Sequence, residues 1–376
     1  MKFIVSTSAL SKHLQAVSGA LSSNNTLPIL DNFLFDIKSG KLKIIATDLH
    51  CSMTTTLDVE SKEDGMIAVP SRILLDTIKT FPEQPIVFDV NTEKFSVEIS
   101  NDSGKYKLQG EDPEDYPKLP EQENVHHVDI NCSVLTDAIN KSLFAVSNDD
   151  LRLAMTGVYT QLSPDGITFV ATDAHKLVKY TRKDTKAAES ASIILPKKAL
   201  NLLKQGLPDE DVNVTVSFNQ THAFFSVKNI QIICRLIDEK YPDYEAVIPK
   251  NNPNKLTIDR VTFLNVLKRV SIFANKTTHQ VRLKFSGSEL QISAEDVDFS
   301  SEAFERLACD YSGEDLEIGF NARFMVEMLS NLDSKQVQME MSTPSRAGII
   351  IPASDDDQEE VLMLVMPVML NNPVMA

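Results

Sequence analysis

The sequence repeats one pattern of strands and helices three times along its 376 residues. Strand-like runs that end in an acidic residue lie at 44–48, 169–173 and 290–295, and a short apolar run that leads into an amphipathic segment follows at 67–78, 193–203 and 318–329. Modules duplicated in the same order usually build a curved or closed array, because each copy packs against its neighbours. The alternative is three duplicated modules that share no purpose.

Six segments have the apolar spacing of amphipathic helices, with apolar residues at steps of three and four. One such segment opens each repeat, and Ser8, Ser133 and Asp259 stand where an N-cap side chain would accept a free backbone N–H. The predicted helices are 8–21, 71–80, 133–146, 197–206, 260–274 and 321–331.

Two connectors rich in proline and acidic residues, at 111–120 and 241–249, separate the repeats. They predict three α+β domains, at 1–122, 123–252 and 253–376, each of a common domain size. Each domain should contain two helices packed on antiparallel sheets of roughly eight strands.

Basic and acidic residues are unevenly distributed between the predicted helices and the rest of the chain. The net charge of −16 argues by itself against a nucleic-acid partner, since phosphate binding requires lysine and arginine. The six predicted helices, however, contain eleven basic and three acidic residues, which leaves −24 for the rest of the chain. This sorting predicts that the helices face one polyanion and contact its phosphates without sequence preference, while the acidic remainder repels DNA. For any single helix, a solvated charged face is the alternative.

No catalytic motif is recognisable. The chain lacks G-x-x-x-x-G-K-[ST], G-x-G-x-x-G and G-x-S-x-G. His126 and His127 have no third ligand nearby, and T172-D-A-H175 matches a strand-end turn that recurs at Thr47 and Asp48 without histidine. We therefore expect a protein that is not an enzyme and that uses no metal or cofactor. Four scattered cysteines without a C-x-x-C pair, and an N-terminus without a long apolar core, predict reduced thiols and a cytoplasmic location.

Close to its end the chain has a run of ten uncharged residues, 361–370, that includes three methionines, and residues 371–376 follow. This run is too short to cross a membrane, which takes about 20 apolar residues. Residues 361–365 are predicted to form a last strand, and residues 366–370 are predicted to leave the sheet, because Pro367 cannot donate to a strand ladder. Methionine is flexible and polarizable and suits a surface that binds several partners.

Taken together, several segments resemble the bacterial DNA polymerase III beta subunit, the family of DNA sliding clamps. The segments are M1-K-F, T26-L-P-I-L-D-N-F-L34, V170-A-T-D-A-H-K-L177, Y241-P-D-Y-E-A-V-I-P-K250, I318-G-F-N321 and V365-M-P-V-M-L370. The resemblance covers essentially the whole chain. It implies a head-to-tail homodimer that closes into a ring around duplex DNA, with helices lining the hole, and that acts as a processivity factor in DNA replication.

The resemblance also implies residues for the DNA contacts and for the subunit joint. The joint would pair Tyr106 and Leu108 with Ile272 and Phe273, although each of these could instead be a core residue of the monomer. The DNA contacts would be Lys12, Arg72, Lys141, Arg152, Lys197, Lys198, Lys268, Arg269 and Lys276.

A hydrophobic pocket for short linear motifs rich in Gln, Leu and Phe is a further implication. The motifs would come from the replicative polymerase, the clamp loader, other polymerases and repair proteins. Met369 replaces an arginine common in the family and Ala246 a larger residue, and residues 371–376 extend past the usual end. The pocket would comprise Met155, Thr172, His175, Lys176, Leu177, Pro242, Val247, Ala347, Val365, Met366, Pro367, Val368, Met369 and Leu370.

Two other functions remain open at the level of the sequence. One is a β-rich peptide-binding adaptor that does not encircle DNA, and the other is a DNA-processing enzyme with an unrecognised site.

Overall fold

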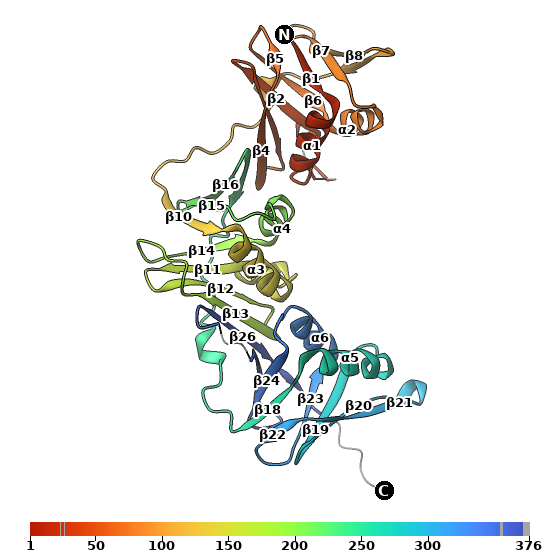
Figure 1. Cartoon of the computed structure of the whole chain (residues 1–376), viewed down its shortest axis with the longest axis vertical. Helices are drawn as coiled ribbons and strands as arrows, with labels where there is room; N and C mark the ends of the chain where they lie inside the picture. The colour runs from red at the N-terminus through yellow and green to blue at the C-terminus, as the bar shows by residue number, and fades with distance from the viewer. Residues whose placement is uncertain (23, 26, 354–355, 371–376) are drawn as a thin grey trace. The chain divides into compact units, whose positions relative to one another are not determined.

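The computed structural model describes residues 1–22, 24–25, 27–353 and 356–370 (Figure 1). Within these ranges the chain forms six α-helices and 27 strands. The helices are α1 (Thr7–Ser18), α2 (Ser71–Thr80), α3 (Cys132–Ser142), α4 (Lys197–Gly206), α5 (Arg260–Val270) and α6 (Ala322–Ser330). All six predicted helices are therefore present, although three of them end three or four residues before the predicted boundary. No helix among the described residues is long and apolar enough to span a membrane.

The chain folds into two compact units, and the middle third contributes strands to both. The first unit comprises Met1–Thr136 and Lys198–Leu236, and the second comprises Asp137–Lys197 and Ile237–Ala376. Each unit contains one long antiparallel sheet and one five-stranded antiparallel sheet.

The first unit has an eight-stranded sheet and a five-stranded sheet. In spatial order, the long sheet is β10 (His126–Asn131), β15 (Asn213–Phe218), β16 (His222–Val227), β17 (Ile230–Arg235), β4 (Cys51–Asp58), β3 (Lys41–Thr47), β2 (Asn32–Lys38) and β6 (Gly65–Pro70). The short sheet is β5 (Glu60–Ser61), β1 (Lys2–Ser6), β7 (Pro85–Asn91), β8 (Ser96–Asn101) and β9 (Gly104–Gln109).

The second unit has a nine-stranded sheet and a five-stranded sheet. The long sheet is β14 (Ala191–Pro196), β11 (Gly157–Ser163), β12 (Gly166–Thr172), β13 (Lys176–Arg182), β26 (Glu359–Val365), β25 (Gly348–Pro352), β24 (Gln336–Met341), β18 (Asn254–Asp259) and β22 (Asp310–Ser312). The short sheet is β21 (Ser301–Ala308), β20 (Glu289–Asp296), β19 (Gln280–Ser286), β23 (Leu316–Asn321) and β27 (Pro367–Val368).

The order of elements confirms the threefold repeat. Apart from the short strands β5, β22 and β27, each third runs strand, helix, three strands, strand, helix, three strands. In the third repeat, the acidic residue equivalent to Asp48 and Asp173 is Asp296, not Glu295 as the sequence pattern suggested. Like Asp48 and Asp173, Asp296 accepts a hydrogen bond from the backbone N–H two residues later, which fixes the turn at the strand end.

Two of the three predicted N-caps are wrong by two residues. Ser6, not Ser8, caps α1 by accepting the N–H of Ala9, and Asn131 accepts the N–H of Ser133 at the start of α3. Asp259 caps α5 as predicted, with its carboxylate 2.8 Å from the Thr262 nitrogen. The errors arise because serine and asparagine lie close together at these sites, so several residues have the chemistry of a cap.

Apolar side chains from both sheets form the core of the first unit. Phe3 and Phe88 stack with ring centroids 4.7 Å apart, and Phe35 from the long sheet meets the edge of the Phe3 ring at 6.4 Å. These three rings are fully buried, and aromatic pairs of this kind contribute roughly 0.5–1.5 kcal/mol beyond the burial of their surface. The helix α1 closes this core by burying Leu10 and Leu14.

Candidate nucleic-acid and peptide interfaces

Two strand pairs join consecutive thirds of the chain in the same way. In the first unit, β4 of the first third pairs with β17, the last strand of the middle third, and Met53 faces Ile232. In the second unit, β13 of the middle third pairs with β26 of the last third, and Val178 faces Met363. Residues in different thirds can be matched by starting at the residue before each helix and following the paired strands outward. In this count Met53 is equivalent to Val178, and Ile232 is equivalent to Met363, so the two strand pairs share one register. The repeat therefore carries a specific joint with one register.

Most of the predicted DNA-contact residues are accessible. Lys12 on α1, Arg72 on α2 and Lys268 on α5 are exposed, as is Lys276 after α5. Arg152 is half exposed and lies 3.6 Å from the Asp149 carboxylate. Side chains of this kind can reach a phosphate without the cost of removing a charge from a buried site.

Three further basic residues are accessible but already have partners. Lys197 donates to the Asn148 amide oxygen at 2.7 Å, and Arg269 forms a two-pronged pair with Glu305. Lys198 lies 2.6 Å from the Asp48 carboxylate, so it forms an ion pair between the middle and first thirds. The Glu305 partner raises the pKa of Arg269 through a side-chain hydrogen bond.

Lys141, the remaining predicted DNA contact, differs from the others because it is buried. Lys141 is 6% exposed, and its ammonium lies 2.5 Å from Glu359 and 3.6 Å from Asp333. It also lies 5.3 Å from the centre of the Tyr180 ring. Two carboxylates and an aromatic face thus surround this cation and compensate its charge within the protein. The sequence pattern misled here because a lysine in the last turn of an amphipathic helix looks exposed.

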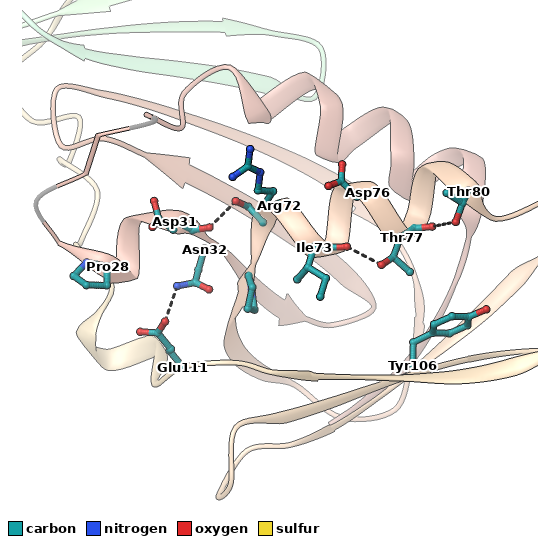
Figure 2. A pocket seen from close by; sticks show the side chains of 12 residues that line it. Pro28, Asp31, Asn32, Arg72, Ile73, Asp76, Thr77, Thr80, Tyr106 and Glu111 are labelled. Carbon is teal, nitrogen blue, oxygen red and sulfur yellow. Dashed lines mark hydrogen bonds between the residues drawn. The ribbon is translucent and has the colours of Figure 1, made fainter.

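A cavity of about 720 Å³ lies between α2 and the edge strand β9 in the first unit (Figure 2). Ile73 of α2 is 52% exposed there, and Tyr106 of β9 is 40% exposed and lies 4.9 Å from the Phe81 ring. Asn32 donates to the Glu111 carboxylate at 3.1 Å and the Ser71 hydroxyl donates to the Asp31 carbonyl, so one end of the cavity is rigidly built. The cavity therefore presents exposed Ile73 and Tyr106 together with one polar, hydrogen-bonded end.

A second cavity, of about 510 Å³, lies in the second unit beside the edge strand β21. Ile272 is 77% exposed, Phe273 41% and Phe304 64%, and Glu302 and Glu305 flank them. Apolar side chains left this open are typical of a protein interface. In contrast, Leu108 is buried in the first unit, which matches the alternative of a core residue for that position.

The sequence analysis missed Ile73 and Phe304 as interface candidates. Both fall on apolar-periodic segments, and apolar periodicity predicts burial. Phe304 points outward because β21 alternates half-buried with exposed residues, and on this strand the exposed set includes an aromatic residue. The sequence signal for Phe304 is that it directly follows Ala303, so two consecutive apolar residues interrupt the alternation of apolar and polar residues expected in a strand.

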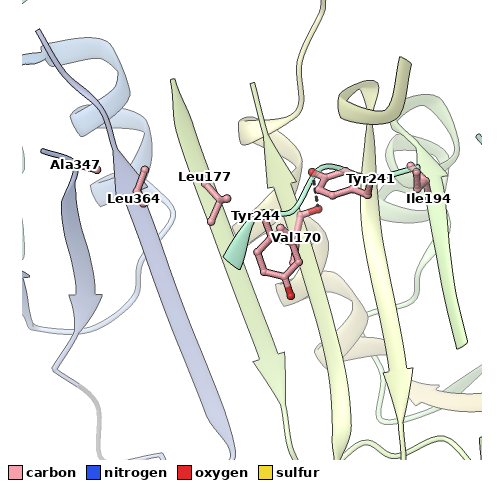
Figure 3. Packing of buried hydrophobic residues seen from close by; sticks show 7 residues of the cluster. All are labelled: Val170, Leu177, Ile194, Tyr241, Tyr244, Ala347 and Leu364. Atoms are coloured by element: carbon pink, nitrogen blue, oxygen red, sulfur yellow. Dashed lines mark hydrogen bonds between the residues drawn. The ribbon is translucent and has the colours of Figure 1, made fainter. Parts of the chain in front are cut away.

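The predicted peptide pocket surrounds the joint between β13 and β26. Leu177 faces Leu364 across this joint, and both are buried with Tyr241, Tyr244 and Ala347 (Figure 3). The Tyr244 hydroxyl donates to the Gln161 side chain at 2.6 Å, and burial raises the pKa of Tyr244 to about 12. These buried residues form one apolar cluster, to which the middle third contributes Leu177, Tyr241 and Tyr244 and the last third contributes Ala347 and Leu364.

Residues 366–370 follow the strand β26, which contributes Leu364 to this cluster. The strand β26 ends at Val365, and the Met366 N–H then donates to the His175 carbonyl at 2.9 Å. The chain leaves the long sheet as predicted, but it does not leave sheet structure altogether, because Pro367 and Val368 pair with β23 in the short sheet. Residues 371–376 lie outside the described residues.

Several apolar residues of the predicted pocket are exposed or partly buried. Val247 is 55% exposed, Met366 41% and Met369 79%, and Met155, Pro242, Pro367, Val368 and Leu370 are partly buried. Ala246 is also exposed. Their exposure leaves these apolar side chains available to a partner.

Three pocket residues have structural partners. Lys176 is 6% exposed and pairs with Asp173 and Glu327, at 3.1 and 3.0 Å, over the Phe324 ring. The buried Thr172 hydroxyl donates to the Lys176 carbonyl, and the exposed His175 ring stacks on Phe324. Lys176 therefore supports the turn that precedes β13 and presents no free charge to a ligand.

A chain of three such repeats, with basic helices and a shared joint between consecutive copies, has the architecture of a DNA clamp. Family models of the DNA polymerase III beta subunit match the N-terminal domain at residues 1–120, the central domain at 129–243 and the C-terminal domain at 245–366. The chain belongs to the DNA polymerase III beta subunit family.

Individual relatives agree with this assignment. The chain is 29% identical over 377 residues to the beta sliding clamp of Staphylococcus epidermidis, covering 98% of this chain and 99% of that relative. It is 28% identical over 373 residues to the beta sliding clamp of Chlamydia muridarum, covering 99% of this chain and all of that relative. Its function is that of a DNA sliding clamp, a non-catalytic processivity factor, so the two alternatives left open by the sequence are set aside.

Solved structures give the same result for the fold. The DNA polymerase sliding clamp from Bacillus subtilis superposes with a TM-score of 0.94 at 25% identity, covering 99% of this chain and all of that chain. The beta subunit from Pseudomonas aeruginosa superposes with a TM-score of 0.92 at 27% identity, covering 98% of this chain and all of that chain. The fold class expected from the repeats, three α+β clamp domains on antiparallel sheets, is confirmed.

Proposed function

We propose that two copies of this chain close head to tail into a ring that encircles duplex DNA and slides along it. Topology then holds the DNA, so each phosphate contact can stay weak and screened by salt. The main support for this proposal is the strand pairing that joins consecutive thirds of the chain, β4 with β17 and β13 with β26. Within the described residues it is used twice inside the chain, and it leaves β21 and β9 each with a neighbour on one side only.

The joint supports a specific register between subunits. The strand β21 corresponds to β4 and β13, and β9 corresponds to β17 and β26. By the same counting, Ala303 takes the place of Met53 and Val178, and Tyr106 takes the place of Ile232 and Met363. Ala303 of one subunit would then face Tyr106 of the other, a small residue opposite a large one.

Charge complementarity supports the same register. One step along the strands, Glu302 would face Lys107, and opposite charges directly across a ladder stabilise it. The side chain of Lys107 is 78% exposed and lies 3.4 Å from the Glu98 carboxylate of its own subunit. It can therefore pair with Glu98 and with Glu302 of the other subunit. Ile272 and Phe273 would enter the apolar cavity beside Ile73 and Tyr106.

The DNA contacts are proposed for the accessible cations of the helices and adjoining loops, without Lys141. Their separation from the acidic remainder of the chain supports the proposal, since a polyanion would be attracted by the helices and repelled elsewhere. The residues are Lys12, Arg72, Arg152, Lys197, Lys198, Lys268, Arg269 and Lys276.

The pocket beside the chain end is proposed to bind short linear motifs of the replicative polymerase, the clamp loader and repair proteins. Exposed Met366 and Met369 support this, because methionine adapts its shape to different apolar side chains. Domain boundaries at 1–122, 123–252 and 253–376 and a cytoplasmic location belong to the same proposal.

Native mass spectrometry and a retention assay test the ring. A dimer should appear at about twice the 41.8 kDa chain mass. Protein loaded on a nicked circle should stay bound in high salt and dissociate when the circle is linearised. Retention that does not depend on DNA ends would contradict encirclement.

A truncation tests the pocket. Removal of residues 366–376 should abolish binding of a fluorescent peptide rich in Gln, Leu and Phe, while the dimer stays intact. Unchanged peptide affinity would refute the pocket and leave the ring untouched.

A further inference from the structure

Two cysteines occupy facing positions on the strand pair that joins the first and middle thirds. Cys51 opens β4, Cys234 lies in β17, and the antiparallel register pairs them directly. Both thiols are free, and the residues are 1% and 0% exposed. Side chains at directly opposed positions lie on the same face of a sheet, so the two sulfur atoms are neighbours in a buried site.

The hydrogen-bond pattern assigns this pair to the closer of the two spacings in an antiparallel ladder. The Arg235 N–H donates to the His50 carbonyl at 2.9 Å, and the Thr56 N–H donates to the Asn229 carbonyl at 3.3 Å. The hydrogen-bonded pairs therefore fall on even-numbered residues of β4, and Cys51 belongs to a non-hydrogen-bonded pair. Such pairs have Cα atoms about 4.5 Å apart, which falls within the range of about 4.4–6.8 Å that disulfides span.

The surroundings keep the two thiols protected until an oxidant reaches them. Burial raises the pKa of Cys51 to about 12, with Asp48 adding to the rise and the Lys198 ammonium opposing it. Burial raises the pKa of Cys234 as well. The Cys51 N–H donates to the Asp48 carboxylate at 2.7 Å, and the same carboxylate pairs with Lys198. Protonated, buried thiols react slowly with external reagents. The geometry of the strand pair, which places each thiol opposite the other, therefore favours the facing thiol as the partner once one sulfur is oxidised.

We propose that Cys51 and Cys234 form a reversible disulfide across β4 and β17 when the protein meets a peroxide. The Cys51 thiol first gives up its proton, and the thiolate sulfur then attacks a peroxide oxygen; the O–O bond breaks, the departing hydroxide combines with that proton to form water, and Cys51 becomes a sulfenic acid. The Cys234 sulfur then attacks the sulfenic sulfur and displaces a second water molecule. Two thiols and one hydrogen peroxide thus give one disulfide and two waters, with two electrons passing from sulfur to oxygen.

This bond would fasten the first third to the middle third. Backbone hydrogen bonds join β4 and β17 in the reduced protein, and the disulfide adds a covalent link between segments 183 residues apart in sequence. The cross-link restricts the unfolded chain and therefore holds the joint closed under oxidising conditions. The proposal does not depend on DNA binding or on the dimer.

The other two cysteines provide an internal comparison. Cys132 is the first residue of α3, and Cys309 follows β21. Neither faces another cysteine in the strand ladders of the described residues. A variant with Cys132→Ala and Cys309→Ala therefore isolates the proposed pair.

Peptide mapping of that variant, at full length, tests the proposal. The protein is treated with hydrogen peroxide, denatured, alkylated and digested with trypsin without reduction. Trypsin releases Cys51 within residues 44–62 and Cys234 within residues 229–235. We expect these two peptides to be linked within one chain, with a mass loss of two hydrogen atoms, and to separate when dithiothreitol is added.

Further substitutions sharpen the result. Cys51→Ala and Cys234→Ala, each made in the same background, should lose the linked peptide and show one free or over-oxidised thiol. The proposal is overturned if both peptides of the parent variant are recovered alkylated, if both carry sulfonic acids without a link, or if the link joins two chains. Because the linked peptide is read directly from the parent variant, poor folding of a single variant does not affect the outcome.

Discussion

The Lys141 ammonium lies 2.5 Å from a Glu359 carboxylate oxygen, and the two side chains are 8% and 20% exposed. The pair joins α3 of the middle third to β26 of the last third inside the second unit. A cation buried in this way acts as a structural brace, although the same residue on a solvent-exposed helix face would be available to a phosphate.

Loss of this brace should be visible in stability. We expect Lys141→Met to lower the free energy of unfolding by about 2 kcal/mol, because the Glu359 carboxylate loses its nearest cationic partner and keeps only the Arg182 guanidinium, 3.8 Å away. Retention on circular DNA at matched folded concentration should not change. Urea denaturation measures the first effect, and Lys268→Met, at an exposed position, is the matched control. Weaker DNA retention with unchanged stability would instead return Lys141 to the DNA-contact set.

The exposed helix cations should behave in the opposite way. Lys12→Gln and Lys268→Gln should each reduce the slope of log affinity against log salt by about 0.9, as expected for the loss of one phosphate contact. Both residues are exposed, so the unfolding free energy should stay within about 0.5 kcal/mol. Fluorescence anisotropy with duplex DNA over a salt series measures the slope. An unchanged slope in both variants would remove these helices from the interface.

The Asp137 carboxyl on α3 should make stability depend on pH. Burial raises the pKa of Asp137, with the Lys141 ammonium partly opposing the rise and Glu359 adding to it. A carboxyl with a raised pKa binds more protons in the folded state, so its contribution to stability is lost as the pH rises through the folded value. Asp137→Asn should therefore be more stable than the parent near pH 7, and the difference should vanish below about pH 4. Urea midpoints measured across this range decide the matter, and a difference that grows on acidification would contradict it.

The repeat made most of the fold predictable from the sequence. Helix periodicity and strand alternation depend on local residue spacing, so all six helices and the eight strands of each third could be inferred. The joint between β13 and β26 could not, because residues 176 and 365 have no local signal that pairs them. The pairing depends on tertiary packing of the whole middle and last thirds.

The candidate sites were predictable to different degrees. Accessible cations such as Lys12 and Arg72 could be inferred from helix position, since a charged side chain opposite an apolar stripe faces water. The burial of Lys141 and Lys176 could not, because each has a carboxylate partner, Glu359 and Glu327 respectively, in a different third of the sequence. A residue's charge is written in the sequence, but the neutralisation of that charge depends on long-range contacts.

Gly319 should control how the chain end docks. A Cβ added at this position would lie 2.7 Å from the Leu370 side chain and 2.7 Å from the Val368 carbonyl oxygen, and the backbone oxygen cannot move aside without breaking the pairing of β27 with β23. Gly319→Ala should therefore displace the tail at a cost of about 1–3 kcal/mol and weaken binding of the motif peptide by about tenfold or more. Peptide anisotropy and amide exchange at Val368 measure the effect. Gly206→Ala, where the nearest atom would be 3.9 Å away, is the control and should bind normally.

The register between subunits can be tested by cysteine pairs. If β21 of one subunit adds to β9 of the other in the register of the internal joints, Ala303 and Tyr106 form a non-hydrogen-bonded pair, as Met53 and Ile232 do. Such a pair brings Cα atoms to about 4.5 Å, close enough for a disulfide. Ala303→Cys combined with Tyr106→Cys should therefore give a covalent dimer under mild oxidation, seen on a denaturing gel without reductant. Phe304→Cys combined with Tyr106→Cys is the control, because residue 304 lies on the opposite face of β21 and should not cross-link. Equal cross-linking of both pairs would mean that the subunits do not use the internal register, and cross-linking of the control pair alone would mean that the register is shifted by one residue.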